Sequence, residues 1–346
     1  MQVLCPDFAR LQALAICIIV APLTSNKLKP ANPGHQRANE LIALQETTMN
    51  LFRLLIISTI LISVIALTTL AQSRQTVVPG VSPQAIAPDP NMPRPIAAVD
   101  SVFLEELTWL EVRDAMRAGK NTVIIATGGI EQNGPYLVLG KHNVVLRATT
   151  EAIARKLGNA LIAPIVPFVP EGNIDPPSSH MKYPGTISLS QGVYKSLITE
   201  IADSMRVHGF RHIILIGDSG GNQKGMGEVA KELSAKWSAN TQESKTTIHF
   251  IPEYYDYPGL QTWIEMEHGI KQIDEGLHDD YAISSTMMVV DPATVRMKQR
   301  QAKGKFSING VKLDPAQKTI AMGKKIVEYR AQITVTAIKK AIGVQP

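Results

Sequence analysis

A carboxylate and an imidazole follow the first strongly β-branched run of the chain. Glu131 and His142 lie on one stretch, residues 128–143, directly after the run at residues 122–126. Carboxylate oxygens and imidazole nitrogens bind zinc and related divalent ions when the side chains converge. A glutamate and a histidine on one loop are also common as separate surface groups. The pair therefore indicates a metal site only in combination with other motifs.

Two further histidines lie in polar stretches later in the chain. His180 precedes a Pro-Gly turn and a short apolar run, which by itself is typical of a loop entering an edge strand. His278 is followed by Asp279 and Asp280 and then by an apolar segment. Acidic residues at such a boundary are typical of a helix N-terminus, where they favour the macrodipole and the exposed amides. Each stretch taken alone is compatible with a structural role.

Residues 216–222 read IGDSGGN and place a serine in a glycine-rich turn. The pentapeptide GDSGG surrounds the nucleophile of trypsin-like serine proteases, but no Ala-Ala-His-Cys-like segment precedes it here. The turn also differs from the Gly-x-Ser-x-Gly elbow of the α/β hydrolases, although Ser219 is central in both. A nucleophilic serine stays open as an alternative. Small residues can also simply allow a tight turn above a sheet.

Alternating strands and helices must position these residues. Short β-branched runs that precede glycine or proline predict buried parallel strands at residues 122–126, 161–165 and 212–216. Helical periodicity predicts helices at residues 109–118, 144–157, 192–208, 225–237 and 315–342, the first with a capping box of Thr108 and Glu111. This alternation predicts an α/β fold, with a mostly parallel sheet covered on both faces. Ligands bind such sheets beyond the carboxyl ends of the strands, so we expect the chemistry in the loops after residues 126 and 216.

Taken together, the four stretches resemble the creatininase (creatinine amidohydrolase) family over about residues 104–297. The loop at Glu131 is similar to the family's Glu-x-His-Gly-x-His-Leu-Pro-x-x-x-Asp, and residues 180–187 to its His-x-x-Phe-Pro-Gly-Thr-Ile. IGDSGGN lies where the family has Asn-Gly-His-Gly-Gly-Asn, and residues 277–292 resemble its His-Ala-Gly-x-x-Glu-Thr-Ser stretch and the following Asp-Pro. Four motifs in the same order are more specific than any one, so the chain is identified as a divergent member.

The resemblance implies a three-layer α/β/α domain, usually a homo-oligomer, with a paired divalent-metal centre of zinc or manganese that hydrolyses a cyclic or linear amide. In such a centre one metal polarises the carbonyl, and the pair lowers the pKa of a bound water until it is hydroxide at neutral pH. The implied substrate is a small molecule or a short peptide. Creatinine itself is disfavoured, because many of the family's site residues are altered in this chain.

Most of the family's metal ligands are replaced here. Five residues stand where the family has histidines, a bridging aspartate or a later glutamate: Asn133, Tyr136, His142, Ser219 and Ile283. Gly221 stands where the glycine-rich loop can carry a glutamate, and Glu131 and His278 are unchanged. The aspartate that bridges two cations is replaced by His142, and a neutral imidazole cannot hold two cations in this way. We therefore expect one ion rather than two.

The motifs predict a rearranged site with named roles. We expect Glu131, His142 and Asp218 to hold the metal, with Asp218 compensating for the histidine lost beside it. His278 and Asp280 are the candidates for moving protons. The residues expected to contact substrate are Asn133, Tyr136, His180, Ser219 and Asn222.

Two other functions stay open. One is a non-catalytic exported binding protein on the same fold, without a metal. The other is a serine hydrolase in which Ser219 is the nucleophile and His142 or His278 the base. The binding protein requires neither a metal nor a nucleophile. The serine hydrolase requires Ser219 but no metal.

The composition limits the partners. The 346 residues carry a formal net charge of only +5, and no Lys/Arg run stands out. Neither a nucleic-acid groove nor a polybasic membrane patch is therefore indicated. The expected partner is a small-molecule or peptide substrate.

The N-terminal part has the layout of a leader. Residues 49–71 hold one positive charge, Arg53, then an apolar run and small residues, which predicts a signal peptide cleaved after Ala71 and a periplasmic or secreted protein. The alternative is an uncleaved membrane anchor at residues 54–71. The other expected boundaries are a non-native or mis-started extension at residues 1–48, a Pro-rich disordered linker at residues 72–98 and a folded domain at residues 99–346.

Overall fold

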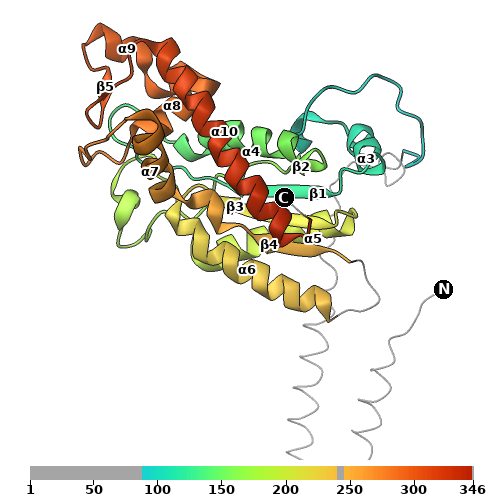
Figure 1. Ribbon diagram of the computed structural model, residues 1–346. Coiled ribbons are helices and arrows are strands. Elements are labelled where there is room, and N and C mark those ends of the chain that lie inside the picture. Colours follow the sequence, from blue (N-terminus) through green and yellow to red (C-terminus); the bar gives the residue numbers. More distant parts are fainter. Residues whose placement is uncertain (1–87, 240–244, 345–346) are drawn as a thin grey trace, which may run out of the picture. The chain divides into compact units, whose positions relative to one another are not determined.

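The computed structural model describes residues 88–239 and 245–344, and a parallel sheet lies at the centre of the folded unit (Figure 1). Its strand order is β2-β1-β3-β4, with β1 (Thr122–Thr127), β2 (Ala160–Ile162), β3 (His212–Gly217) and β4 (Thr247–Phe250). All neighbouring strands are parallel. Thr127 pairs with Gly217, so β1 and β3 end at the same edge of the sheet. The loops that follow these two strands therefore begin side by side.

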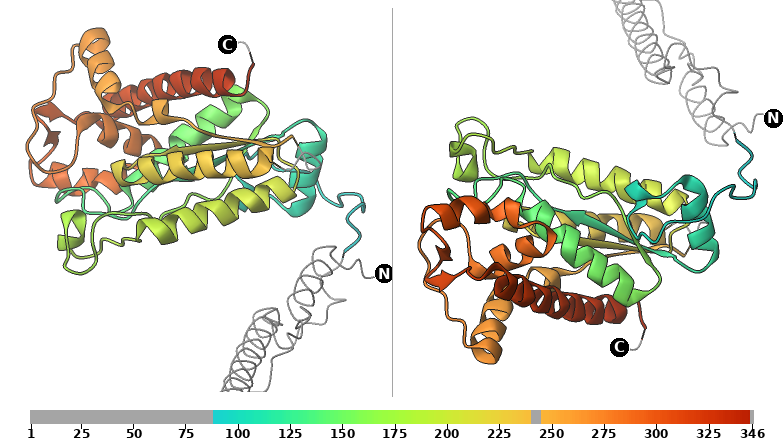
Figure 2. Two further views of the ribbon diagram at one scale, coloured as in Figure 1. Left: turned by 90° about the horizontal axis from the view of Figure 1, so that it is seen from below. Right: turned by 90° about the horizontal axis from the view of Figure 1, so that it is seen from above.

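Helices cover both faces of the sheet. On one face lie α4 (Lys141–Leu157) and α10 (Ala316–Ala341), and on the other α5 (Gln191–Val207) and α6 (Gly220–Ser238) (Figure 2). Alternate residues of β1 point to opposite faces, so Val123 and Ile125 pack in one core cluster while Ile124 and Ala126 pack in another. A strand that is buried on both faces must be apolar throughout. The predicted three-layer α/β/α fold is confirmed.

A third core cluster lies among the later helices. It includes Leu260, Met287 and Ile326, and it joins α7 (Tyr257–His268), α8 (Tyr281–Val290) and the first half of α10. The remaining elements are α3 (Trp109–Arg117), α9 (Met297–Ala302), the hairpin of β5 (Ser307–Ile308) and β6 (Val311–Lys312), and the 3-10 turns η2 (Leu104–Glu106), η3 (Ser179–Lys182), η4 (Pro252–Tyr255) and η5 (Pro292–Val295).

The ends of several elements differ from the prediction. The strand expected at residues 161–165 stops at Ile162, because Pro164 has no N–H to continue the ladder. α4 and α6 begin three and five residues earlier than expected, at Lys141 and Gly220. The run after His180 forms no regular strand and makes isolated bridges only. The capping box of Thr108 and Glu111 is present, as predicted.

The interpretations of the N-terminal part are not tested by the structure. The extension at residues 1–48, the signal peptide at residues 49–71 and residues 72–87 of the linker lie outside the described residues. They stay predictions, as does the domain boundary at residue 99. No helix in the described part of the chain is both long and apolar enough to cross a membrane.

Candidate metal centre

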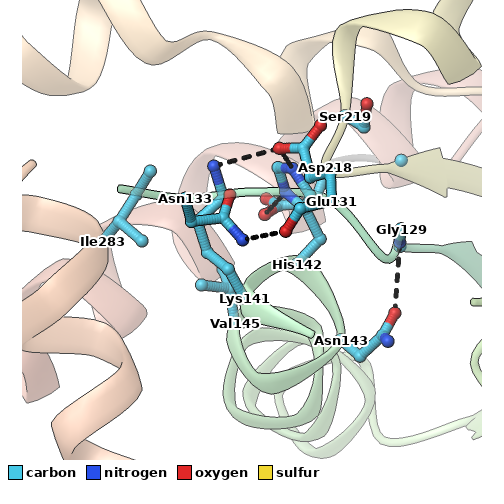
Figure 3. A network of polar contacts seen from close by, with 12 residues as sticks. Gly129, Glu131, Asn133, Lys141, His142, Asn143, Val145, Asp218, Ser219 and Ile283 are labelled. Carbon is cyan, nitrogen blue, oxygen red and sulfur yellow. Dashed lines mark hydrogen bonds and ion pairs between the residues drawn. The ribbon is translucent and has the colours of Figure 1, made fainter. Parts of the chain in front are cut away.

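The loops after β1 and β3 meet at His142, in the first turn of α4. Its Nε2 lies 2.7 Å from Oε1 of Glu131, and its Nδ1 lies 2.8 Å from Oδ2 of Asp218. The two carboxylates therefore lie on opposite sides of one imidazole ring (Figure 3). All three side chains are buried. Each ring nitrogen of His142 is therefore within hydrogen-bond distance of a different carboxylate.

Asp218 is anchored by α10 as well as by His142. Its Oδ1 accepts hydrogen bonds from Nη2 of Arg330, at 2.8 Å, and from the hydroxyl of Tyr257, at 3.0 Å. The Arg330 guanidinium also lies over the Tyr254 ring, 4.2 Å from its centroid. Burial raises the pKa of Asp218, but the Arg330 charge and the His142 hydrogen bond outweigh it and hold the pKa below its usual value. Asp218 is thus a fully engaged, ionised carboxylate.

The predicted ligand set of Glu131, His142 and Asp218 does not surround one point. The two nitrogens of an imidazole point in diverging directions, and here each faces a different carboxylate. One ion therefore cannot be bound by all three side chains as they lie in this structure. The contacts instead indicate that His142, held by Asp218, fixes the orientation of the Glu131 carboxylate.

A different set of donors converges at Glu131. One ligand atom each from Glu131, His180 and His278 lie within 4.8 Å of one another. Nε2 of His278 is 3.0 Å from Oε1 of Glu131, and Nε2 of His180 is 3.4 Å from Oε2. One carboxylate and two imidazoles form the donor set of several catalytic zinc sites. By their chemistry, these residues fit a single divalent ion.

The protonation states also suit metal binding. Burial lowers the pKa of His180, which favours the neutral imidazole that a metal requires. Burial raises the pKa of Glu131, but hydrogen bonds from His142 and His278 and the charge of Lys141 outweigh it and hold the pKa well below its usual value. His278 has a φ of +59°, a left-handed conformation that is uncommon outside glycine and that is enriched at functional sites.

A cavity of about 610 Å³ opens beside this cluster. His278 and Lys141 both line it, together with polar side chains that include Gln261, Gln272 and Asn309. Lys141 is only 2% exposed, and its Nζ lies 3.2 Å from Oε1 of Glu131. This volume is within the usual range for small-molecule sites. The cavity therefore brings a small ligand to His278 and to a buried positive charge.

Three of the other predicted residues have structural partners. Asp280 caps α8 by accepting a hydrogen bond from the Ile283 amide at 2.6 Å, so its carboxylate is already engaged. Asn133 and Asn222 are 0% exposed. Asn133 Nδ2 donates to the Glu131 carbonyl at 2.7 Å, and Asn222 Nδ2 donates to the Gly128 carbonyl at 2.9 Å. These amides stabilise the loop after β1, whereas we expected them to contact substrate.

The remaining two predicted residues contact side chains other than the three of the cluster. The Tyr136 ring lies 4.1 Å from the Arg300 guanidinium, and the Ser219 hydroxyl donates to Oε2 of Glu171 at 3.3 Å. Among the residues that the structure describes, no histidine hydrogen-bonds to Ser219. A serine nucleophile requires such a base within reach. The geometry therefore does not support the serine-hydrolase alternative.

Three residues of the site escaped the sequence analysis. Lys141 begins a helix, where a cation is disfavoured by the macrodipole, and that position was a signal for a nearby carboxylate. Arg330 lies on the buried face of α10, on the same stripe as Ile326 and Ala331, and a lone arginine on such a stripe implies a buried partner. Glu171 lies in an irregular loop between Pro170 and Gly172, and no pattern there distinguishes it.

Comparisons with known proteins agree with this architecture. A profile of the family Creatininase, described as creatinine amidohydrolase, matches residues 105–338. A creatinine amidohydrolase from Pseudomonas putida is 26% identical over 116 residues, which are 34% of this chain and only 44% of that relative. A solved structure named Creatininase Mn has a TM-score of 0.53 at 19% identity, over 70% of this chain and 98% of that one. A creatininase variant of the Zn-Zn type has a TM-score of 0.50 at 20% identity, over 70% and 99%. At these identities the structural likeness shows the fold alone.

Proposed function

The chain belongs to the creatininase family, and from this premise we propose that it is a metal-dependent amidohydrolase that cleaves a C–N bond in a small molecule or short peptide. The observation that carries the proposal is the convergence of Glu131, His180 and His278 beside a cavity of about 610 Å³. His278 belongs to both, so a substrate in the cavity would contact the cluster at His278. The substrate class rests on the family and on the size and polarity of the cavity.

We propose that the centre holds one divalent ion, zinc or manganese, with Glu131, His180 and His278 as ligands. The positions that would serve a second ion support this reading. Asn133 donates to backbone carbonyls, and both nitrogens of His142 already face carboxylates. A bound ion polarises the scissile carbonyl and lowers the pKa of a water molecule.

The remaining side chains orient Glu131 and stabilise negative charge on the substrate. Lys141 places a buried positive charge at the cavity wall, where it favours the negative charge that develops on the oxygen of the scissile amide. His142, Asp218 and Arg330 form a continuous chain of hydrogen bonds behind Glu131. Such support keeps a ligand in one orientation, and its loss commonly lowers metal affinity 10- to 100-fold.

Metal removal tests the proposal directly. Protein from metal-supplemented medium is expected to contain about one zinc or manganese per chain, measured by elemental analysis. Chelation is expected to abolish hydrolysis of a panel of small cyclic and linear amides, and to lower the melting temperature. At an ion concentration 100 times Kd the loss of stability is about 2.7 kcal/mol. Restoring the ion should restore both quantities.

The same assay separates the alternatives. Ser219→Ala is expected to retain hydrolysis to within about tenfold, since the hydroxyl contacts Glu171 and, among the described residues, no histidine. Protein that holds no metal but hydrolyses amides, and loses this activity in Ser219→Ala, would contradict the proposal. Protein that binds metal and ligands but cleaves nothing in the panel would favour a binding protein on the same fold.

We also propose that the protein is exported, on the basis of the leader layout at residues 49–71. N-terminal sequencing of the protein from the cell envelope or medium is expected to give a chain that begins after Ala71. A chain that retains residues 54–71 would indicate a membrane anchor instead. On the family premise we propose a homo-oligomer, which sedimentation analysis would test.

A further inference from the structure

Glu171, in the irregular loop after β2, lies next to one residue of the proposed metal centre, Glu131. It is 4% exposed, and its Oε2 accepts a hydrogen bond from the Ser219 hydroxyl at 3.3 Å. Its Oε1 is buried and has no hydrogen-bond partner. The carboxyl group of Glu171 also contacts that of Glu131. A buried oxygen without a partner, next to a second carboxylate, calls for a physical explanation.

The cations of the site are already paired with other carboxylates. Lys141 contacts Glu131, and Arg330 contacts Asp218. No lysine, arginine or histidine in the described ranges forms an ion pair with Glu171. Two carboxylates in contact at a buried site are stabilised when they share a divalent cation, which changes the local charge balance.

Two glycines leave room for this side chain. A Cβ on Gly129 would lie 2.2 Å from Oε1 of Glu171, and a Cβ on Gly221 would lie 2.1 Å from the Pro170 carbonyl oxygen. Gly129 and Ser219 border the network in Figure 3. Any other residue at position 221 would displace the backbone that carries Glu171.

We propose that Glu171 is a further carboxylate ligand of the metal centre. The cation that Glu131 binds is the one that Glu171 shares. Gly129 and Gly221 are glycines because each leaves the space that the Pro170–Glu171 segment occupies. The inference rests on the proposed function, since it requires that the cluster bind a divalent ion.

Calorimetric titration of metal-free full-length protein with Zn²⁺, and separately with Mn²⁺, tests the role of Glu171. Glu171→Gln is expected to weaken binding about 10- to 100-fold, the usual effect of losing a group that orients or ligates a metal. The melting temperature of the metal-free variant is expected to be no lower than that of the metal-free wild type, because the substitution removes repulsion with Glu131. Glu253→Gln, at an exposed position, is the matched control and should bind as the wild type does.

Gly129→Ala provides a second and independent test. Its new methyl group meets the flexible end of Glu171, which can turn aside without movement of the backbone. The fold is therefore expected to be kept, while the metal affinity falls as in Glu171→Gln. Gly192→Ala is the control, because a Cβ there meets nothing within 4 Å.

The outcomes separate this inference from the proposed function. If the wild type binds neither ion, the proposed function and the role of Glu171 both fail. If the wild type binds an ion and both variants bind it equally tightly, only the role of Glu171 fails. If Glu171→Gln loses affinity but Gly129→Ala does not, the Gly129 part of the inference is overturned and the ligand role is supported.

Discussion

Arg330→Met is expected to lower the free energy of unfolding by about 3–5 kcal/mol, the usual cost of removing one partner of a buried ion pair. The substitution leaves Asp218, which is 0% exposed, without the guanidinium that lies 2.8 Å from its Oδ1. Denaturant unfolding of metal-free protein measures the change. The double variant Asp218→Asn/Arg330→Met removes both charges, and it is expected to recover part of the loss.

The control for this prediction is Arg155→Met. Arg155 pairs with Glu151 and Asp100 at the surface, and such pairs contribute about 0–1 kcal/mol. A loss in Arg330→Met no larger than in Arg155→Met would show that the buried pair does not stabilise the fold as argued. The pH dependence has a definite sign. The pKa of Asp218 is held below its ordinary value of about 3.9, so the stabilisation is complete above that pH and is lost as the pH falls through the lower folded value.

Glu131→Gln is expected to lower amide hydrolysis about 10³-fold, because a bound metal contributes several kcal/mol to catalysis and each 1.36 kcal/mol is tenfold in rate. Among the residues that the structure describes, only Glu131 contacts all of His142, His180, His278 and Lys141. Its replacement therefore affects both the metal and the buried lysine. Steady-state kinetics and metal content, measured on the same preparation, give the result.

Because Glu131 is buried, its replacement can also disturb the core. A second variant is therefore needed that changes the site and leaves the core intact. His278→Asn serves this purpose, since the side chain is 45% exposed and asparagine tolerates a positive φ. It is expected to show a comparable loss of hydrolysis and of metal, with little change in the melting temperature of the metal-free protein. Full activity in His278→Asn, in protein that still holds its ion, would exclude His278 from the centre.

The layers of the fold follow from local pattern, which is why they could be predicted. The run at residues 122–127 is apolar on both faces, and this leaves a buried parallel strand as its natural state. The prediction was wrong at helix starts that build the site. Helical periodicity predicts a helix only from Val144, whereas α4 begins at Lys141. Helix ends depend on tertiary partners such as Glu131, and these partners are not visible along the chain.

The site was harder to predict, because its residues are far apart in the sequence and come together only in the folded protein. The motifs indicate that four residues are neighbours: Glu131, His142, Asp218 and His278. They do not show which of these side chains contact one another. The motifs predict His142 as a metal ligand, whereas its two nitrogens face two carboxylates. Glu171 gave no signal at all, because its place beside Glu131 depends on the path of an irregular loop.

The pair of Asp218 and Arg330 also determines when the site can be completed during synthesis of the chain. The two residues are 112 positions apart, and at ribosomal rates of 5–20 residues per second the arginine is made about 6 to 22 seconds after the aspartate. During this interval β1, β3 and α4 can already associate, but the carboxylate at their junction has no guanidinium. The nascent polypeptide can therefore build its sheet well before it can complete the metal centre. Maturation of the centre is expected to be one of the last events of synthesis, when α10 docks.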